Sequence, residues 1–598
     1  MFICEQFESS WNEDQAETQF QGMGSSHELA AVLLTECLQF SRYSLKKPVY
    51  VLYLDAKSAF DVVRKEPLLR NLFFLNKGPD ILLSHINNRV SHRQTVLDWD
   101  TNLMGPIHDE LGLEQGGVNS SDFYKIFGKE QLELAQKSEL GVKMKNLTIS
   151  AIGQADDTVL ISNSISALRF LLVLTLHFCN RYKVQLSAEK TKLQVYNLPS
   201  NDQSLHYNPI KINEIPVPFV HQAEHVGILR STNGNCPTIL DRFSAHKRAL
   251  WSVMHTGLAR GHRANPAVTI KIERMYAVPV LLSGLAALVL SKKEVDMIDH
   301  HFMETIRQLL RLHKNTPRCA VFFLAGTLPG IALLHLRQLS LFNMICRLPD
   351  NVLHKHALNW FTSVVNFKGS WLQQIRDICL MYNLPHPSVL LKSTMDKNAF
   401  KKLSKKRVIS YWEQVLRAEA VSLKSLSYFK PSHMSLVAPH PIWKTAGNSP
   451  YKVAMATVQA VMVSGRYRCG ALTRHWGTSS GFCTLSPICV STMDDLDHII
   501  KVCPALHTVR SSLLQFTTNY ASTLPLNISE LLLKKCNILS PTFTNIILDC
   551  SVDPDVILTC QDVGFHVLDV LFMVTRSWAY VLHRERLKLL GRWRCSFN

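Results

Sequence analysis

With 598 residues, the chain is too long for one ordinary domain, and several domains are expected. Its 46% hydrophobic and 19% charged residues are typical of a folded protein and exclude a largely disordered one. The formal net charge of +18 predicts a polyanionic partner, either nucleic acid or an anionic membrane surface.

The sequence offers little support for a membrane partner or for secretion. Its most apolar run, residues 277–290, is too short to span a bilayer, contains a proline and a glycine, and is expected to be a buried helix. The first residues, MFICEQFESSWNEDQ, are acidic and lack the apolar core of a signal peptide. The 15 cysteines are therefore expected to be reduced thiols, some of them metal ligands. We expect an intracellular protein of the nucleus and/or cytoplasm that is not secreted and has no membrane partner.

The first chemically informative segment is a strand that ends on a carboxylate. A helix is expected from Ser25, and the apolar residues 48–54 then predict a buried strand. Asp55 follows this strand directly, where a sheet can present a catalytic group from rigid structure. The alternative is that Asp55 caps a short helical segment expected through Leu69.

A second segment places two glycines directly after a glutamine. Gln115, Gly116 and Gly117 precede a helix that is expected to run on through Phe127. Glycines let the backbone come close to a flat ligand, but an ordinary connection before a helix is equally compatible with this pattern.

The third segment is an acidic pair inside an apolar stretch. Asp156 and Asp157 lie between Ile149–Ile152 and Val159–Ile161, which predicts a hairpin with the carboxylates at its bend. Such carboxylates can bind cations or position protons, and the alternative is a polar surface hairpin without chemistry.

The segments after this hairpin continue an ordered series. An amphipathic helix over residues 168–179 is followed by Lys190-Thr191-Lys192, a strand over 193–196, a hairpin over 210–220 and His225-Val-Gly227. Together with Asp55, Gln115-Gly-Gly and Asp156-Asp157, this order resembles the palm of reverse transcriptases, most closely those of non-LTR (LINE-like) retrotransposons.

The resemblance implies a role for each matching residue. Asp55, Asp156 and Asp157 would hold two Mg²⁺ ions, which in such enzymes lie about 3.5–4 Å apart and serve both ends of an in-line displacement. Lys190, or Lys192 in its place, would donate a proton to the pyrophosphate. The residues expected to contact substrate are Phe60 against the sugar of the nucleotide and Gln115, Gly116 and Gly117 along template and nucleotide.

By the same resemblance the chain is an RNA-directed DNA polymerase, whose partners are an RNA template, a DNA primer or target and deoxynucleoside triphosphates. Relative to the family it lacks the endonuclease domain and most of the fingers, so a 5′-truncated element or a partial gene model is expected. The alternative function is a truncated, catalytically inactive remnant that binds nucleic acid. A maturase-like or telomerase-like enzyme is a more distant option.

Near the C-terminal end, Cys483, Cys489, His498 and Cys503 have the residue types of a tetrahedral zinc site. Their order resembles the Cys-Cys-His-Cys element that follows the polymerase in LINE-like proteins, which implies structural zinc. The alternative is four unconnected buried side chains.

The expected fold class is α+β: a right-hand polymerase palm with an antiparallel sheet and incomplete fingers, followed by a mainly helical thumb and C-terminal region with a small zinc-binding element. The expected divisions are partial fingers and palm at 1–235, thumb and post-thumb at 236–345, a helical basic region at 346–465, the zinc-knuckle-like element at 466–510 and a helical segment at 511–598. The sequence leaves the oligomeric state open.

Overall fold

The computed structural model describes most of the chain, namely residues 27–75, 84, 87–88, 90–91, 94–100, 102–108, 111–114, 120–144, 147–198, 208–255, 264–348, 369–475, 477–489, 491–564 and 566–591. The chain divides into two compact units. The first comprises Met1–Arg242, Leu282–Glu294 and Leu334–Ser404, and the second comprises Phe243–Leu281, Val295–Leu333 and Lys405–Asn598.

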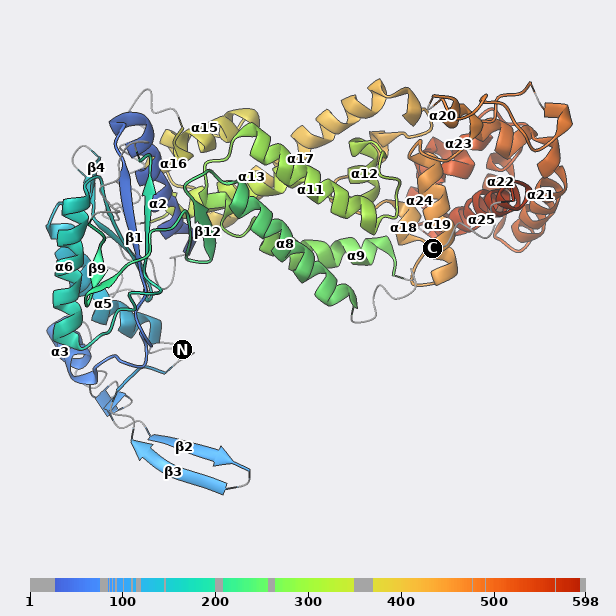
Figure 1. Ribbon diagram of the computed structural model, residues 1–598. Coiled ribbons are helices and arrows are strands. Elements are labelled where there is room, and N and C mark those ends of the chain that lie inside the picture. Colours follow the sequence, from blue (N-terminus) through green and yellow to red (C-terminus); the bar gives the residue numbers. More distant parts are fainter. Residues whose placement is uncertain are drawn as a thin grey trace. The chain divides into compact units, whose positions relative to one another are not determined.

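The first unit is built on a four-stranded antiparallel sheet in the order β6-β7-β1-β8. Strand β1 of this sheet is labelled in Figure 1. Its strands are β1 Val49–Leu54, β6 Ala151–Gln154, β7 Asp157–Ser162 and β8 Lys192–Tyr196. All six residues of β1 are buried, because this apolar strand lies inside the sheet and is covered by protein. The sequence-based strands around Asp55 and the acidic pair are therefore confirmed.

Four helices pack in this unit around the sheet (Figure 1): α2 His27–Phe40, α3 Lys65–Leu75, α5 Ser120–Lys137 and α6 Ile165–Tyr182. Ser164 caps α6, because its side chain accepts a hydrogen bond from the backbone N–H of Ala167. The buried side chains of α5 and α6 meet in an aromatic cluster in which the rings of Phe127 and Phe178 lie 5.7 Å apart. These contacts fix the strands that carry the acidic hairpin.

The helix expected directly after Asp55 begins later than the sequence suggested. Residues 57–62 form turns, and α3 starts only at Lys65 and continues to Leu75. The backbone of Ala56 pairs instead with Leu186, and Ser58 adopts a positive φ of 48°. Pairing with a distant segment has thus replaced local helix formation, and Asp55 is not the cap of α3.

Four small hairpins and several helices complete the described part of the first unit. The strands are β2 Gln94–Trp99 with β3 Asn102–His108, β4 Val142–Met144 with β5 Leu147–Ile149, β9 Lys211–Ile212 with β10 Ile215–Pro216, and β11 Gln222–His225 with β12 Ile228–Ser231. The helices here are η2 Ser41–Leu45, η6 Leu285–Ala287, α15 Trp371–Met381, α16 Pro387–Lys392 and parts of α8 Cys236–Val253, α11 Lys292–Leu309, α13 Gly330–Cys346 and α17 Lys397–Ser422.

The apolar run over residues 277–290 is largely buried, but the expectation of one helix is wrong. It contains α10 Val278–Leu282 and the short η6, which are separated at Gly284. Gly284 has a φ of 75°, and a Cβ on it would lie 2.4 Å from Cγ1 of Ile228. The close approach of β12 therefore requires glycine and breaks the helix.

The second unit is helical in its described part, as expected. Its elements are part of α8 Cys236–Val253, α9 Pro266–Ile272, η5 Glu273–Ala277, most of α11 Lys292–Leu309, α12 Arg318–Ala325, part of α13 Gly330–Cys346, part of α17 Lys397–Ser422, α18 Pro441–Lys444, α19 Pro450–Val463, α20 Gly470–His475, η10 His498–Val502, α21 His507–Ala521, α22 Leu526–Lys535, α23 Phe543–Leu548, α24 Pro554–Val563 and α25 His566–Leu589. Trp443 and Trp578 are fully buried in this unit.

Within the described residues, no single helix has the length and apolar character needed to cross a membrane. One bent pair, Arg318–Ala325 with Gly330–Cys346, meets that test on length and composition alone.

A buried carboxyl group lies inside the first unit on α2. The Glu36 side chain is 1% exposed, and one of its oxygens accepts a hydrogen bond of 3.0 Å from the backbone N–H of Leu372. Burial raises the pKa of Glu36 to about 8, although backbone hydrogen bonds from Leu372 and Trp371 act in the opposite direction. The folded protein therefore retains a proton on Glu36 that the unfolded chain releases at lower pH.

Glu36→Gln is expected to change the pH dependence of stability. Because the folded pKa lies above the unfolded value of 4.5, this group favours folding most below pH 4.5, and that contribution falls by up to about 1.4 kcal/mol per pH unit toward pH 8. The measurement is the melting temperature of both proteins from pH 5 to 8, where the variant should have the flatter profile. Glu214→Gln, whose side chain is 93% exposed, is the control, and equal slopes in all three proteins would contradict the assignment.

Candidate functional site

The three aspartates expected to act together are adjacent at one end of the sheet. β1 and β7 pair with Leu54 opposite Thr158, so one further step along both strands sets Asp55 opposite Asp157. Asp156 occupies the tight turn between β6 and β7, which Gln154 and Asp157 close as the last pair. Ala155 takes a φ of 55° in this turn, which turns the chain without a longer loop.

Asp55, Asp156 and Asp157 together carry an excess of negative charge. The pKa of Asp157 is raised to about 6, first by burial and then by the neighbouring carboxylates of Asp156, Glu224 and Asp55. Within the described part of the chain, no ion pair with a cation is formed by Asp55, Asp156 or Asp157. Oxygen ligands with uncompensated charge suit a hard divalent cation such as Mg²⁺.

The backbone of Asp55 is held by the loop that precedes β8. Its N–H donates to the hydroxyl Oγ1 of Thr191 at 3.2 Å, and its carbonyl accepts a 2.8 Å hydrogen bond from the N–H of Ser187. Thr191 is fully buried. Lys190 lies between these two contacts with an exposed side chain, and its N–H donates to Oγ of Ser187 at 3.3 Å. The loop that carries Lys190 is thereby joined to the carboxylate strand.

Phe60 lies on the path from Asp55 to α3 and is half-buried. Its ring stacks on Tyr124 of α5 with centroids 4.8 Å apart, and its carbonyl accepts a 2.8 Å hydrogen bond from the N–H of Leu113. Burial, then the charge of Asp156, raises the pKa of Tyr124. Phe60 and Tyr124 therefore form an aromatic surface next to the carboxylates. Gln115, Gly116 and Gly117 lie outside the described residues.

The β11–β12 hairpin packs against the sheet near its acidic end. Val226 and Gly227 both have positive φ values, 48° and 75°, as a two-residue turn requires. The buried ring of His225 lies 5.7 Å from the ring of Tyr53 on β1, and burial lowers the pKa of this histidine well below its usual value. Glu224 points to the other side of β11, where it is exposed.

A buried amide connects this hairpin to the sheet. Oε1 of Gln194 on β8 accepts hydrogen bonds from the hydroxyls of Tyr53 at 2.9 Å and Tyr196 at 2.8 Å. Its Nε2 donates to the carbonyls of His221 and Arg230, each at 3.0 Å. The amide thus accepts two hydrogen bonds and donates two, which fixes the hairpin, β1 and β8 relative to one another.

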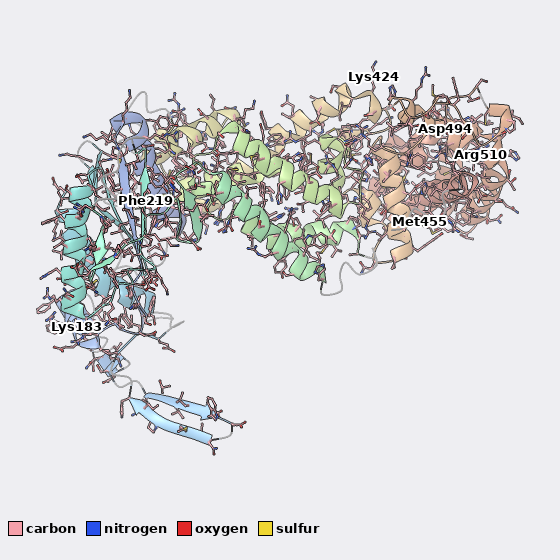
Figure 2. The ribbon with its side chains drawn as sticks, viewed as in Figure 1. Lys183, Phe219, Lys424, Met455, Asp494 and Arg510 are labelled. Atoms are coloured by element: carbon pink, nitrogen blue, oxygen red, sulfur yellow. The ribbon has the colours of Figure 1, made fainter. Side chains whose placement is uncertain are left out.

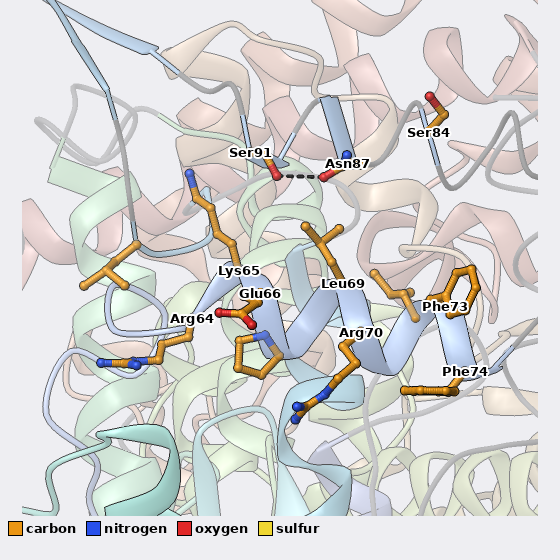
Figure 3. A pocket seen from close by; sticks show the side chains of 13 residues that line it. Arg64, Lys65, Glu66, Leu69, Arg70, Phe73, Phe74, Ser84, Asn87 and Ser91 are labelled. Atoms are coloured by element: carbon orange, nitrogen blue, oxygen red, sulfur yellow. Dashed lines mark hydrogen bonds between the residues drawn. The ribbon is translucent and has the colours of Figure 1, made fainter.

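A separate pocket of about 1010 Å³ lies along α3 (Figure 3). Basic side chains line it together with the exposed rings of Phe73 and Phe74, and Ser91 donates a 2.8 Å hydrogen bond to Asn87 at its rim. Leu111, which also lines it, pairs with Arg64 shortly before the glutamine–glycine segment. The three basic residues of the lining are Arg64, Lys65 and Arg70.

Three residues near the carboxylates were not anticipated. Thr191 could have been found, since alternation along the following strand places it on the same face as Leu193. Tyr124 lies in the helix that was expected to run on through Phe127, and no sequence pattern assigned it a role at the site. No local sequence pattern predicts that Glu224 lies near Asp157. Its position depends on how the β11–β12 hairpin packs, and Glu224 follows Asp157 by 67 residues in the sequence.

In the second unit, the four residues expected as a zinc site are brought together. Cys483, Cys489, His498 and Cys503 are buried, and their ligand atoms all lie within 4.8 Å of one another. The Sγ atoms of Cys483 and Cys503 are 3.9 Å apart. Neither ring nitrogen of His498 has a hydrogen-bond partner within the described residues. Buried thiols around a histidine with no other partner fit a Zn²⁺ ion.

Backbone contacts shape this cluster. The N–H of Cys483 donates to the carbonyl of Thr492 at 2.9 Å, and the N–H of Cys503 donates to the carbonyl of His498 at 2.8 Å. Arg510 donates to the carbonyl of Cys503 from α21, and Asp494 forms a buried 2.6 Å ion pair with Arg586 of α25. Asp494 and Arg510 are labelled in Figure 2. The ligand loops are therefore attached to two helices of the unit.

Comparison with known proteins agrees with the geometry of the first unit. No curated protein matches the chain. Residues 15–223 match the family described as "Reverse transcriptase (RNA-dependent DNA polymerase)". This range includes Asp55, Phe60, Gln115, Asp156 and Lys190. Residues 15–223 of this chain are a reverse transcriptase domain.

Proposed function

We propose that the chain is the RNA-directed DNA polymerase of a non-LTR (LINE-like) retrotransposon, which extends a DNA primer on an RNA template. The observation that carries the proposal is the adjacency of Asp55, Asp156 and Asp157 at the end of a central strand pair in a reverse transcriptase domain. The net charge of +18 supports a nucleic-acid partner. A location in the nucleus or cytoplasm is part of the same proposal.

The carboxylates of Asp55, Asp156 and Asp157 would hold two Mg²⁺ ions, which supply charge neutralisation at the attacking and leaving oxygens. Rigid strand pairing would hold the carboxylates in position before substrate binds, so that little reorganisation is needed during reaction. The Lys190 ammonium, on the loop joined to Asp55, would donate a proton to the pyrophosphate as it leaves.

Phe60 would select deoxynucleotides by lying against the sugar of the incoming nucleotide. Its stacking on Tyr124 limits the movement of the ring, so that a 2′-hydroxyl could not displace it easily. Gln115, Gly116 and Gly117 would lie along the template and the nucleotide.

The LINE-like assignment is supported by the order of motifs within residues 55–227 and by the Cys-Cys-His-Cys cluster that follows the reverse transcriptase domain. We propose that this cluster binds one structural Zn²⁺ and that the ion holds the loops around it. The basic residues of the region would then be presented to RNA.

Asp156→Asn is expected to abolish primer extension on an RNA template in the presence of Mg²⁺, because it removes one of three metal-binding carboxylates. Incorporation of labelled deoxynucleotide by the full chain is the measurement, and Asp562→Asn on α24 is the matched control. Retained activity in Asp156→Asn would reject the catalytic assignment. RNA binding without primer extension in the unmodified chain would favour the alternative, an inactive nucleic-acid-binding remnant.

Thr191→Val is expected to lower the rate of primer extension by ~10-fold or more while the protein stays folded. Valine has the same shape, but it leaves the N–H of Asp55 without an acceptor, which is worth about 1–3 kcal/mol in buried surroundings. Single-turnover extension gives the rate, and thermal melting monitors folding. Thr175→Val, which removes a buried hydroxyl from α6, is the control, and equal rates in the two variants would contradict a positioning role for Thr191.

The zinc assignment predicts about one Zn²⁺ per chain in purified protein. Cys503→Ser should lose the metal and the cobalt–thiolate absorption of cobalt-substituted protein, whereas Cys560→Ser, a half-buried cysteine of α24, should keep both. Elemental analysis and absorption spectra are the measurements. A protein that contains no zinc and takes up no cobalt would leave the cluster as four buried side chains.

A further inference from the structure

A second cavity lies in the first unit at the end of the sheet opposite the carboxylates. It has a volume of about 690 Å³, which is in the range of small-molecule sites. Its walls come from the end of α2 and η2, the end of β8, the residues after β12 and the segment 288–294. Tyr196, in its wall, pairs with Val49 at the start of β1, roughly 20 Å of strand away from Asp55.

One wall contains a buried arginine without a counter-charge. Arg230 is 5% exposed, and its guanidinium donates to Oγ1 of Thr35 at 3.2 Å and to the carbonyl of Ala31 at 2.8 Å. Both acceptors are neutral, Nε has no partner, and no carboxylate pairs with Arg230 within the described residues. A buried charge of this kind is unfavourable unless an anion compensates it.

A second arginine lies beside an aromatic ring at the rim of the cavity. Arg42 is exposed, and its guanidinium carbon lies 5.3 Å from the ring centroid of Tyr43. Tyr43 is 49% exposed and lies against Gly369, where a Cβ would come within 2.7 Å of the ring. The ring is thereby held between the chain and solvent, and the Arg42 cation lies over it.

The one carboxylate among the lining residues is already engaged. An oxygen of Glu294 accepts hydrogen bonds from the N–H of Ser291 at 2.7 Å, from the hydroxyl of the same serine at 2.9 Å and from Nδ2 of Asn235 at 3.4 Å. Glu294 thus stabilises the start of α11 through its hydrogen bonds with Ser291. The two arginines outnumber it, so the lining carries excess positive charge.

The remaining lining suits a base and a sugar. Phe219, labelled in Figure 2, is 36% exposed, and its ring meets the ring of His221 at 5.5 Å. Tyr196 adds a phenol, and Asn233 adds an amide. Aromatic faces combined with arginines are the features by which proteins hold unpaired nucleotides.

We propose that this cavity is a second nucleotide-binding site, distinct from the polymerase centre, that takes a nucleoside 5′-phosphate. The phosphate would be held by Arg42 and Arg230, and the base would lie against Tyr43 or Phe219. The nucleotide is either free in solution or an unpaired residue of an RNA strand, since both present the same chemistry to the cavity.

Photolabelling of the full chain tests the proposal. One probe is 8-azidoadenosine 5′-monophosphate, and the other is a five-nucleotide single-stranded RNA that contains 4-thiouridine. Labelled peptides should contain Tyr43, Tyr196 or Phe219. Unlabelled adenosine 5′-monophosphate should compete with the first probe, whereas adenosine, which lacks the phosphate, should compete poorly.

Arg42→Glu should reduce labelling of these peptides by ~10-fold, because it replaces an exposed phosphate-binding cation with an anion. Lys143→Glu on β4 makes the same charge change at an exposed position elsewhere in the unit and is the control. Arg230→Met is a second variant, but since Arg230 is buried, the exposed Arg42 decides the outcome if that variant does not fold.

The two probes identify the source of the ligand. Labelling by the monophosphate supports a free nucleotide, and labelling by the RNA alone supports an RNA strand. Asp156→Asn should leave this labelling unchanged, which separates the cavity from the polymerase centre. Absence of labelling in the cavity peptides, or equal labelling in Arg42→Glu and Lys143→Glu, would overturn the proposal.

Discussion

The antiparallel pairing of β1 with β7 is the constraint on which the candidate centre depends. A shift of one residue in this register would move every side chain of β7 to the opposite face and separate Asp157 from Asp55. The apolar residues of both strands oppose such a shift, because Val51, Leu52, Val159, Leu160 and Ile161 are all buried and a slipped register would place each side chain in packing that fits its neighbour. Hydrophobic burial along the strands thus sets the positions of carboxylates that are themselves partly solvated.

A second constraint fixes the position of the β11–β12 hairpin relative to the sheet. Gln194 uses both ends of its amide to connect β1, β8 and the β11–β12 hairpin, and an unsatisfied amide at this depth would be unfavourable by about 1–3 kcal/mol. The hairpin must therefore adopt one position, with His225 on Tyr53 and Glu224 near Asp157. The extra carboxylate at the centre is a consequence of a polar network on the opposite face of the same hairpin.

The sequence predicted the parts of the fold that depend on local pattern. Strand 48–54 and the strands of the acidic hairpin are apolar runs that end at polar residues, which a local pattern predicts. The set of Cys483, Cys489, His498 and Cys503 was predicted because thiols and imidazole are rare and specific metal ligands. The remainder depended on contacts between distant segments. The turn after Asp55 follows from pairing with Leu186, and the break at Gly284 follows from the approach of Ile228. Periodicity along one segment contains no information about such partners.

The two ends of the sheet carry opposite unsatisfied charges, and neither can neutralise the other. Within the described residues, Arg230 pairs with no carboxylate, and Asp55, Asp156 and Asp157 pair with no cation. The penalty for a buried unpaired ion is several kcal/mol. We therefore propose a separate counter-ion for each end, a divalent cation at Asp55, Asp156 and Asp157 and an anion at Arg230. β1, buried along its whole length, keeps the two sites apart.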